Sequence, residues 1–164
     1  MYKIGKIPVT WNTEFKSLQY KKQPVTEEEI SDWEKKGYYH KNFTGNMYDS
    51  KNPMPSWTKN VADSFPELKD TTFTLYRMDT LEIMPTHVDH FRRYCEVFNV
   101  ERSKVRRVLV FLEDWKPGHY FEVDGKGVVN WKAGDYCIWE PDVDHAASNI
   151  GIEPRYTLQM TGHV

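Results

Sequence analysis

The feature that most constrains the fold is a run of short strand-like segments that begins near residue 71 and continues almost to the end of the chain. Only one helical segment, residues 90–104, interrupts the run, so the crossover helices that a parallel sheet needs are missing. Many short strands favour a mainly β fold with flanking helices, either a sandwich or a barrel-like jelly roll. The segments are TFTLYRM, TLEIMP, RRVLVFLEDW, HYFEVDG, GVVNW, DYCIWEP and RYTLQMTG.

Glycine-containing turns separate several of these segments. Residues 124–127 (DGKG) and 132–135 (KAGD) each have the composition of a tight hairpin. The interrupting segment places Phe91, Tyr94, Cys95 and Phe98 on one helical face. We therefore expect closely spaced strands joined by tight turns, with one amphipathic helix among them.

The first part of the chain has a different texture, rich in Pro, Asn and Gly, and carries two helical signals. Thr26 can cap a helix, and the Glu three residues later can complete a capping box. In residues 56–65, apolar side chains recur at helical spacing until a proline ends the pattern. We expect a single domain, residues 1–164, with a helical and irregular buttress over about 1–70 and a β core over about 71–164.

Composition excludes several classes of partner. The net charge of −2 gives no electrostatic basis for binding nucleic acid or a membrane surface. The opening residues contain no apolar run typical of a signal peptide, and no later segment is long enough to span a bilayer. Two cysteines, Cys95 and Cys137, cannot build a disulfide framework or a CxxC zinc site. We expect a reduced, soluble, cytoplasmic protein.

Two potential metal ligands lie close together in MPTHVDHF, residues 84–91. In an extended segment, side chains at positions i and i+2 project to the same face, so His87 and Asp89 can reach one ion. An imidazole nitrogen with a carboxylate oxygen suits Fe(II) or a similar divalent metal. The pair alone is a weak signal, and a polar loop after Pro85 is the alternative.

The best candidate for a third ligand is His145, which follows the apolar segment DYCIW and precedes a glycine turn. With His87 and Asp89 it would form a facial triad that leaves coordination positions open for oxygen and a cosubstrate. His90 and His119 are the rival ligands. His90 would suit a helix-borne pair, and His119 better suits a hydrogen-bonded or substrate-contacting role.

A potential anion receptor lies ten residues beyond His145. In the segment RYTLQM, Arg155 and Thr157 point to the same side of a strand. An inward guanidinium is costly unless an anion meets it, and a guanidinium beside a hydroxyl suits a carboxylate. The alternative is an edge strand with Arg155 in solvent.

Together these residues resemble the Fe(II)/2-oxoglutarate-dependent oxygenase superfamily over about residues 73–162. HVD matches the HxD pair, the His at 145 matches the distal ligand, and RYT matches the Arg-x-Ser/Thr pair. The run NWKAGDYCIWEPDVDHAASNIG is most similar to aspartyl/asparaginyl hydroxylase-like members, and FLED with GHYFEV to prolyl-hydroxylase-like ones. Asp89 departs from the first branch, and GHYFE from the second.

The resemblance implies a double-stranded β-helix with iron at its open end. It implies that His87, Asp89 and His145 bind Fe(II), and that Arg155 and Thr157 hold the far carboxylate of 2-oxoglutarate. Tyr76 would assist them. The implied reaction uses O2 to hydroxylate an aliphatic C–H of an amino acid, a peptide side chain or a small metabolite, and releases succinate and CO2.

The substrate contacts are less constrained. Arg92 and Arg93 follow the proposed ligands and could meet an acidic substrate, although a solvated helix face is the simpler interpretation. His119, Trp139 and Trp115 could line the entrance, but the two tryptophans suit a core role equally well. A cupin-like metal-binding or isomerase protein without 2-oxoglutarate chemistry is the main alternative, and a non-enzymatic jelly-roll module is another.

Overall fold

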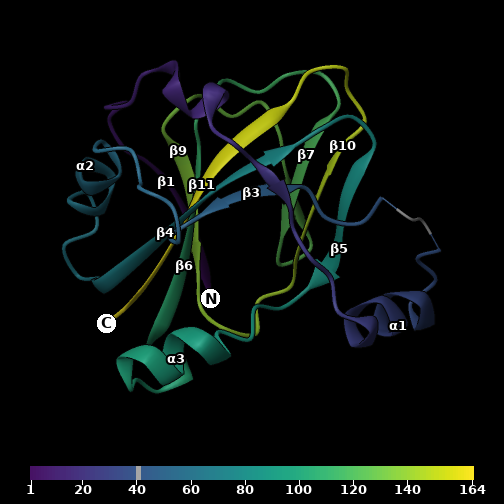
Figure 1. Cartoon of the computed structure of the whole chain (residues 1–164), viewed down its shortest axis with the longest axis horizontal. Helices are drawn as coiled ribbons and strands as arrows, with labels where there is room; N and C mark the ends of the chain where they lie inside the picture. The colour runs from purple at the N-terminus through teal and green to yellow at the C-terminus, as the bar shows by residue number, and fades with distance from the viewer. Residues whose placement is uncertain (40–41) are drawn as a thin grey trace.

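A computed structural model describes residues 1–39 and 42–164, and within these ranges two antiparallel sheets pack face to face (Figure 1). The seven-stranded sheet has the order β1 (Tyr2–Lys6), β9 (Asp135–Trp139), β6 (Val105–Phe111), β11 (Arg155–His163), β4 (Lys69–Met78), β3 (Asn46–Asp49) and β2 (Lys21–Lys22). The four-stranded sheet has the order β5 (Glu82–His87), β10 (His145–Asn149), β7 (His119–Val123) and β8 (Lys126–Val128).

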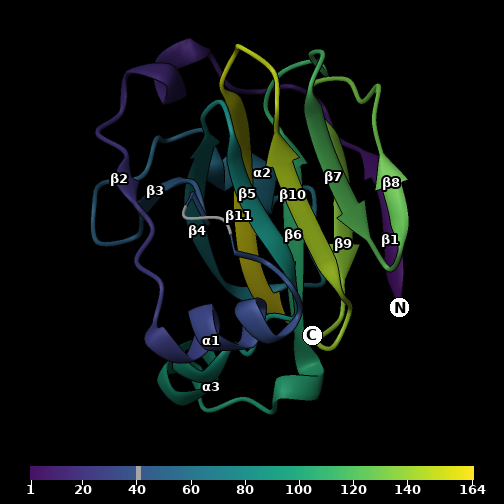
Figure 2. The same ribbon diagram turned by 90° about the vertical axis from the view of Figure 1, so that its right-hand side faces the viewer.

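The chain passes repeatedly between the two sheets from β4 onward. β4, β6, β9 and β11 belong to the larger sheet, whereas β5, β7, β8 and β10 belong to the smaller one, which faces the viewer in Figure 2. This winding is a double-stranded β-helix, so the expected mainly β jelly roll is confirmed. The interior between the sheets holds mostly apolar side chains from both, including Phe111 and Phe121.

The outer face of the larger sheet is covered by the amino-terminal part of the chain. Leu75, Val110 and Leu158 are fully buried there against Phe15 and Trp57. Phe15 comes from the short 3₁₀ helix η1 (Thr13–Ser17), and Trp57 immediately precedes helix α2 (Thr58–Ala62), which lies beside the sheet in Figure 1. The amino-terminal part therefore encloses a second core on this face.

The expectation of a purely helical and irregular buttress over residues 1–70 needs correction. This part supplies β1, β2 and β3 to the larger sheet, and β4 already begins at Lys69. The sequence does not indicate these strands, because they are short and polar. KK forms β2 and NMYD forms β3, and neither segment alternates apolar with polar residues. Pairing with a neighbouring strand decides their conformation.

The predicted helices are present, with shorter bounds in two cases. Helix α1 spans Glu27–Lys35 and begins with the full capping box of Thr26 and Glu29. Helix α2 covers five residues, and α3 (Arg92–Phe98) is followed by the separate 3₁₀ helix η2 (Arg102–Lys104). Asn99, in the left-handed region at φ 50°, ends α3 before the predicted boundary.

One of the two predicted hairpins is confirmed and the other is wrong. Asp124 and Gly125 form a two-residue turn, both with positive φ, between the paired strands β7 and β8. Residues 132–135 also form a turn, in which the Asp135 amide donates to the Lys132 carbonyl. The strands on either side of this second turn belong to different sheets, so it is a crossing between sheets.

Candidate metal centre

His87, Asp89 and His145 form the one cluster of at least three potential metal ligands found among the described residues. One ligand atom of each lies within 4.8 Å of those of the others. His87 ends β5, and His145 begins β10 and is its cross-strand partner, so the pairing of two strands brings the imidazoles together. Asp89 follows two residues after His87, as the spacing predicts.

Backbone carbonyls fix the orientation of both imidazoles. The Nδ1 of His87 lies 2.8 Å from the Pro85 carbonyl, and the Nδ1 of His145 lies 3.0 Å from the Val143 carbonyl. A carbonyl only accepts, so each Nδ1 carries a proton, and in the neutral tautomer that this bond selects the lone pair lies on Nε2. Burial lowers the pKa of His145 to about 4, although the Asp89 carboxylate opposes this shift. Neutral imidazoles with free Nε2 atoms are the form that binds a metal.

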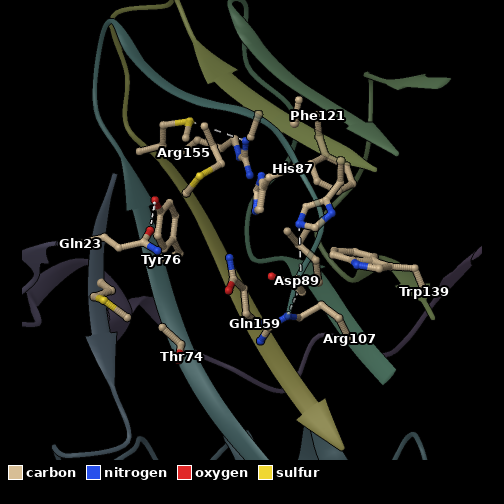
Figure 3. Close-up of a pocket in the computed structure, with 17 residues that line it drawn as sticks. Gln23, Thr74, Tyr76, His87, Asp89, Arg107, Phe121, Trp139, Arg155 and Gln159 are labelled. Carbon is tan, nitrogen blue, oxygen red and sulfur yellow. Dashed lines mark hydrogen bonds and ion pairs between the residues drawn. The ribbon is translucent and has the colours of Figure 1, made fainter. Parts of the chain in front are cut away.

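The carboxylate of Asp89 is held by an arginine of the opposite sheet. The Nε of Arg107 on β6 donates to Asp89 Oδ2 at 3.0 Å (Figure 3). Its Nη1 donates to Thr161 Oγ1 at 2.6 Å. Burial alone would raise the pKa of Asp89, but Arg107, with the two nearby imidazoles, holds that pKa well below its usual range. Asp89 is therefore ionised and oriented.

A second arginine, Arg102, joins the segments that carry two of the ligands. It donates to the backbone carbonyls of Asp89 at 3.0 Å and His90 at 3.2 Å. The same guanidinium makes a two-pronged ion pair with Asp142, three residues before His145, at 2.7 and 2.9 Å. Bidentate pairing of this kind fixes geometry as well as charge.

The three ligands border a cavity of about 180 Å³ between the sheets. Apolar side chains form part of its wall, and polar groups enter from the larger sheet and from the amino-terminal part of the chain (Figure 3). The lining residues are Gln23, Met47, Thr74, Tyr76, Met78, Met84, His87, Asp89, Arg107, Leu109, Phe121, Trp139, His145, Ala146, Ala147, Arg155 and Gln159.

Arg155 projects from β11 into this same cavity and is only 3% exposed. Its Nη1 donates to the Tyr120 carbonyl at 3.1 Å, but its buried Nε has no hydrogen-bond partner. No carboxylate among the described residues pairs with it, and burial lowers its pKa to about 10. β11 lies in the interior of the sheet, so the alternative of an edge strand with Arg155 in solvent is wrong.

The two predicted helpers of Arg155 differ in accessibility. Tyr76 lines the cavity, and its hydroxyl donates to Gln23 Oε1 at 2.8 Å and accepts from the Gly45 amide. Thr157 lies on the same face of β11 but is not a lining residue, and its buried hydroxyl has no partner. The structure thus brings Tyr76 to the cavity, whereas Thr157 is not among the residues that line it.

Of the predicted substrate contacts, only Trp139 lines the cavity, with its ring 4.8 Å from that of His145. His119 is buried elsewhere, where its Nε2 lies 2.9 Å from the Glu153 carbonyl. Arg92 and Arg93 are exposed at the start of α3 and do not line the cavity. His90, the rival ligand, is exposed and contributes only its carbonyl to Arg102.

Sequence reasoning missed the groups that surround the ligands. Arg107 lies in the apolar run RRVLVF. Side chains two residues apart share one face of a strand, so Arg107 lies on the inner face with Leu109 and Phe111. Gln159, four residues beyond Arg155, likewise lies on the same face of its strand as Arg155. Strand alternation was the available signal for both residues, whereas nothing local indicated Arg102 or Gln23.

No protein-family profile and no curated protein sequence matches the chain. Among solved structures, it is similar to a prolyl-4-hydroxylase from Pseudomonas putida, with a TM-score of 0.58 and 14% identity over 99% of this chain and 91% of that one. The chain is a double-stranded β-helix protein. At 14% identity, this structural similarity shows the fold alone.

Two further similar structures have lower scores. A predicted oxalate decarboxylase from Thermotoga maritima has a TM-score of 0.44 and 15% identity, covering 73% of this chain and 80% of that one. A protein with a double-stranded β-helix domain from Klebsiella pneumoniae has a TM-score of 0.41 and 17% identity, covering 59% and 70%. No helix among the described residues is long and apolar enough to cross a membrane.

Proposed function

We propose that this β-helix protein is an Fe(II)- and 2-oxoglutarate-dependent dioxygenase that hydroxylates an aliphatic C–H of an amino acid, a peptide side chain or a small metabolite. The observation that carries the proposal is Arg155, a buried cation without an anionic partner among the described residues, in the same cavity as the three ligands. A buried unpaired guanidinium is costly, and a dicarboxylate bound at the metal would offset that cost.

Each residue of the site has a distinct task in this proposal. His87, Asp89 and His145 hold Fe(II), since two neutral imidazoles and one carboxylate are the donor set that non-haem Fe(II) oxygenases use. Arg155 holds the far carboxylate of 2-oxoglutarate, with Tyr76 beside it. The bound metal, 2-oxoglutarate and O2 supply the oxidising chemistry, with succinate and CO2 as co-products.

The protein contributes positioning and the exclusion of water. Arg107 keeps Asp89 ionised and aligned, and the carbonyls of Pro85 and Val143 keep each imidazole turned with Nε2 toward the other ligands. The apolar part of the wall, including Phe121 and Leu109, limits the access of bulk water to the ligands.

The proposal is tested by measuring succinate formed from 2-oxoglutarate by the Fe(II)-loaded protein, first without an added substrate and then with amino acids and peptides. His145→Ala should abolish metal-dependent turnover. Arg155→Met should abolish turnover while leaving metal binding intact, because Arg155 is not a ligand. Undiminished succinate formation by either variant would contradict the proposal.

A cupin-like metal-binding protein without 2-oxoglutarate chemistry is the second candidate. One observation favours it. Arg155 already donates to the Tyr120 carbonyl, and the hydroxyl of Thr157 is buried, so these two residues have a partly structural role. In that case the protein should bind a divalent metal, while added 2-oxoglutarate should neither raise its melting temperature nor alter the metal's spectrum.

A further inference from the structure

The inner face of the larger sheet carries a second polar position, four residues beyond Arg155 on the same strand. Gln159 on β11 is the cross-strand partner of Thr74 on β4 and of Leu109 on β6, and all three line the cavity. At the usual rise of a strand, the Cα atoms of Arg155 and Gln159 are about 13 Å apart. One strand therefore presents a cationic position and a neutral polar position to the same cavity.

The side chains of Gln159 and Thr74 are free to bind a ligand. Neither makes a side-chain hydrogen bond to any described residue, and neither has a buried, unpartnered polar atom. The polar residues beside them are occupied: Tyr76 is bonded to Gln23, and Thr161 is bonded to Arg107. Figure 3 shows the Gln159 side chain on β11 among the side chains that line the cavity.

The charges near this pair are already balanced. Arg107, the nearest cation on the adjoining strand β6, is paired with Asp89. Of the side chains nearby, Asp89 would repel a carboxylate and Arg107 would repel an ammonium group. Neither charge would find an unpaired side chain of opposite sign beside this pair, so a charged group would lose hydration that these side chains do not replace.

We propose that Gln159 and Thr74 form the substrate subsite and that the group they bind is an uncharged amide, either a primary carboxamide or a peptide group. The carboxamide of Gln159 offers a donor and an acceptor side by side, which an amide can meet reciprocally. Thr74 supplies a hydroxyl that can either donate or accept a hydrogen bond. The inference rests on the proposed function, because it assigns Arg155 to the cosubstrate and this pair to the substrate.

The rest of an amide-bearing molecule has room beside the cavity. A second hollow of about 210 Å³ adjoins it and shares with it His87, Asp89 and two further residues, Gln23 and Met84. It continues between the residue 87–90 segment and the amino-terminal part of the chain, where its wall includes Pro24, Val25 and Trp33. A substrate extending from the amide would lie along these apolar groups.

The test uses four probes of matched shape: isobutyramide, N-methylisobutyramide, isobutyrate and isobutylamine. Their dissociation constants are measured from the paramagnetic broadening of the probe methyl signals by the Mn(II)-loaded protein. Both amides should bind at least about tenfold more tightly than the acid or the amine. A preference for isobutyramide indicates a primary carboxamide, and a preference for the N-methyl compound indicates a peptide group.

Three variants complete the test. Gln159→Leu should weaken amide binding about tenfold, the scale of one or two hydrogen bonds, and Thr74→Val should weaken it several-fold. Thr72→Val is the matched control on the same face of β4, and its amide affinity should change less than twofold. Equal binding of all four probes, or an unchanged amide affinity in Gln159→Leu, would overturn the inference.

Each titration is repeated with and without saturating 2-oxoglutarate, whose own binding is measured first by calorimetry. Failure of 2-oxoglutarate to bind counts against the proposed function alone, because the amide preference is read from the metal-loaded protein in both series. An amide preference that depends on Gln159 supports the subsite whichever way the cosubstrate titration falls.

Discussion

At the scale of single residues, the sequence indicates the three candidate ligands that the structure brings together, but it does not indicate the residues that support them. His87 and Asp89 share a short motif whose spacing places them on one side of an extended segment. Arg107 lies 18 positions from Asp89 and meets it across the space between the sheets. Contacts of this kind depend on strand order and register, which local patterns do not determine.

Arg102 should act as a positioning residue for the metal ligands. Because it holds the backbone at Asp89 and also the carboxylate of Asp142, Arg102→Gln should weaken Mn(II) binding about tenfold, the low end for residues that support metal ligands. The measurement is a calorimetric metal titration. Arg106→Gln is the matched control, since Arg106 pairs with Glu140 and contacts no ligand segment. Equal losses in both variants would contradict this role.

His119 should make folding stability sensitive to pH. Burial lowers the pKa of His119 in the folded protein, so the unfolded chain takes up its proton more readily. The associated stability is present above the unfolded pKa of about 6.5 and is lost as pH falls from there toward the lower folded pKa. Urea unfolding at pH 7.5 and 5.5 should show a smaller loss for His119→Gln than for the parent protein. An identical loss would contradict the assignment.

At the scale of elements, strands with strong apolar alternation were predictable and polar ones were not. β10 has the sequence HAASN, which lacks the branched and aromatic residues typical of strands. It forms because β5 and β7 hydrogen-bond to it on both sides. The strand that begins with His145 is therefore produced by tertiary context, although the sequence does indicate His145 itself as a candidate ligand.

The β7–β8 hairpin should depend on Gly125. Its φ of 70° lies in the left-handed region, where a side chain costs about 1–2 kcal/mol. Gly125→Ala should lower the free energy of unfolding by about that amount, as measured by urea denaturation. Asp124→Asn is the control, because Asn-Gly is favoured in this type of turn, and it should leave stability unchanged or slightly raised. A neutral Gly125→Ala would show that the turn is not constrained as described.

At the scale of the whole molecule, one sheet separates two cores. Val110 and Leu158 face the amino-terminal part of the chain, whereas Leu109 and Phe111 face the smaller sheet and the cavity. The amino-terminal part thus stiffens the back of the sheet that carries Arg155 and Gln159. It also supplies Gln23 directly to the cavity.

The molecule should unfold as one cooperative unit, as expected for a single domain. Leu158 is fully buried at the centre of the outer core, so Leu158→Ala should cost about 2–5 kcal/mol. Tryptophan fluorescence and circular dichroism should report one coincident transition, shifted to lower urea in the variant. Two separated transitions would show that the amino-terminal part folds independently of the β core.

The most direct test of the central claim compares 2-oxoglutarate with pyruvate, which has the same 2-oxo acid group but lacks the far carboxylate. Calorimetry on the anaerobic Mn(II)-loaded protein should show that 2-oxoglutarate binds about 10- to 100-fold more tightly than pyruvate, as expected for a charge-assisted contact with Arg155. In Arg155→Met the two acids should bind equally. Equal affinities in the parent protein, or an undiminished preference in Arg155→Met, would contradict the account.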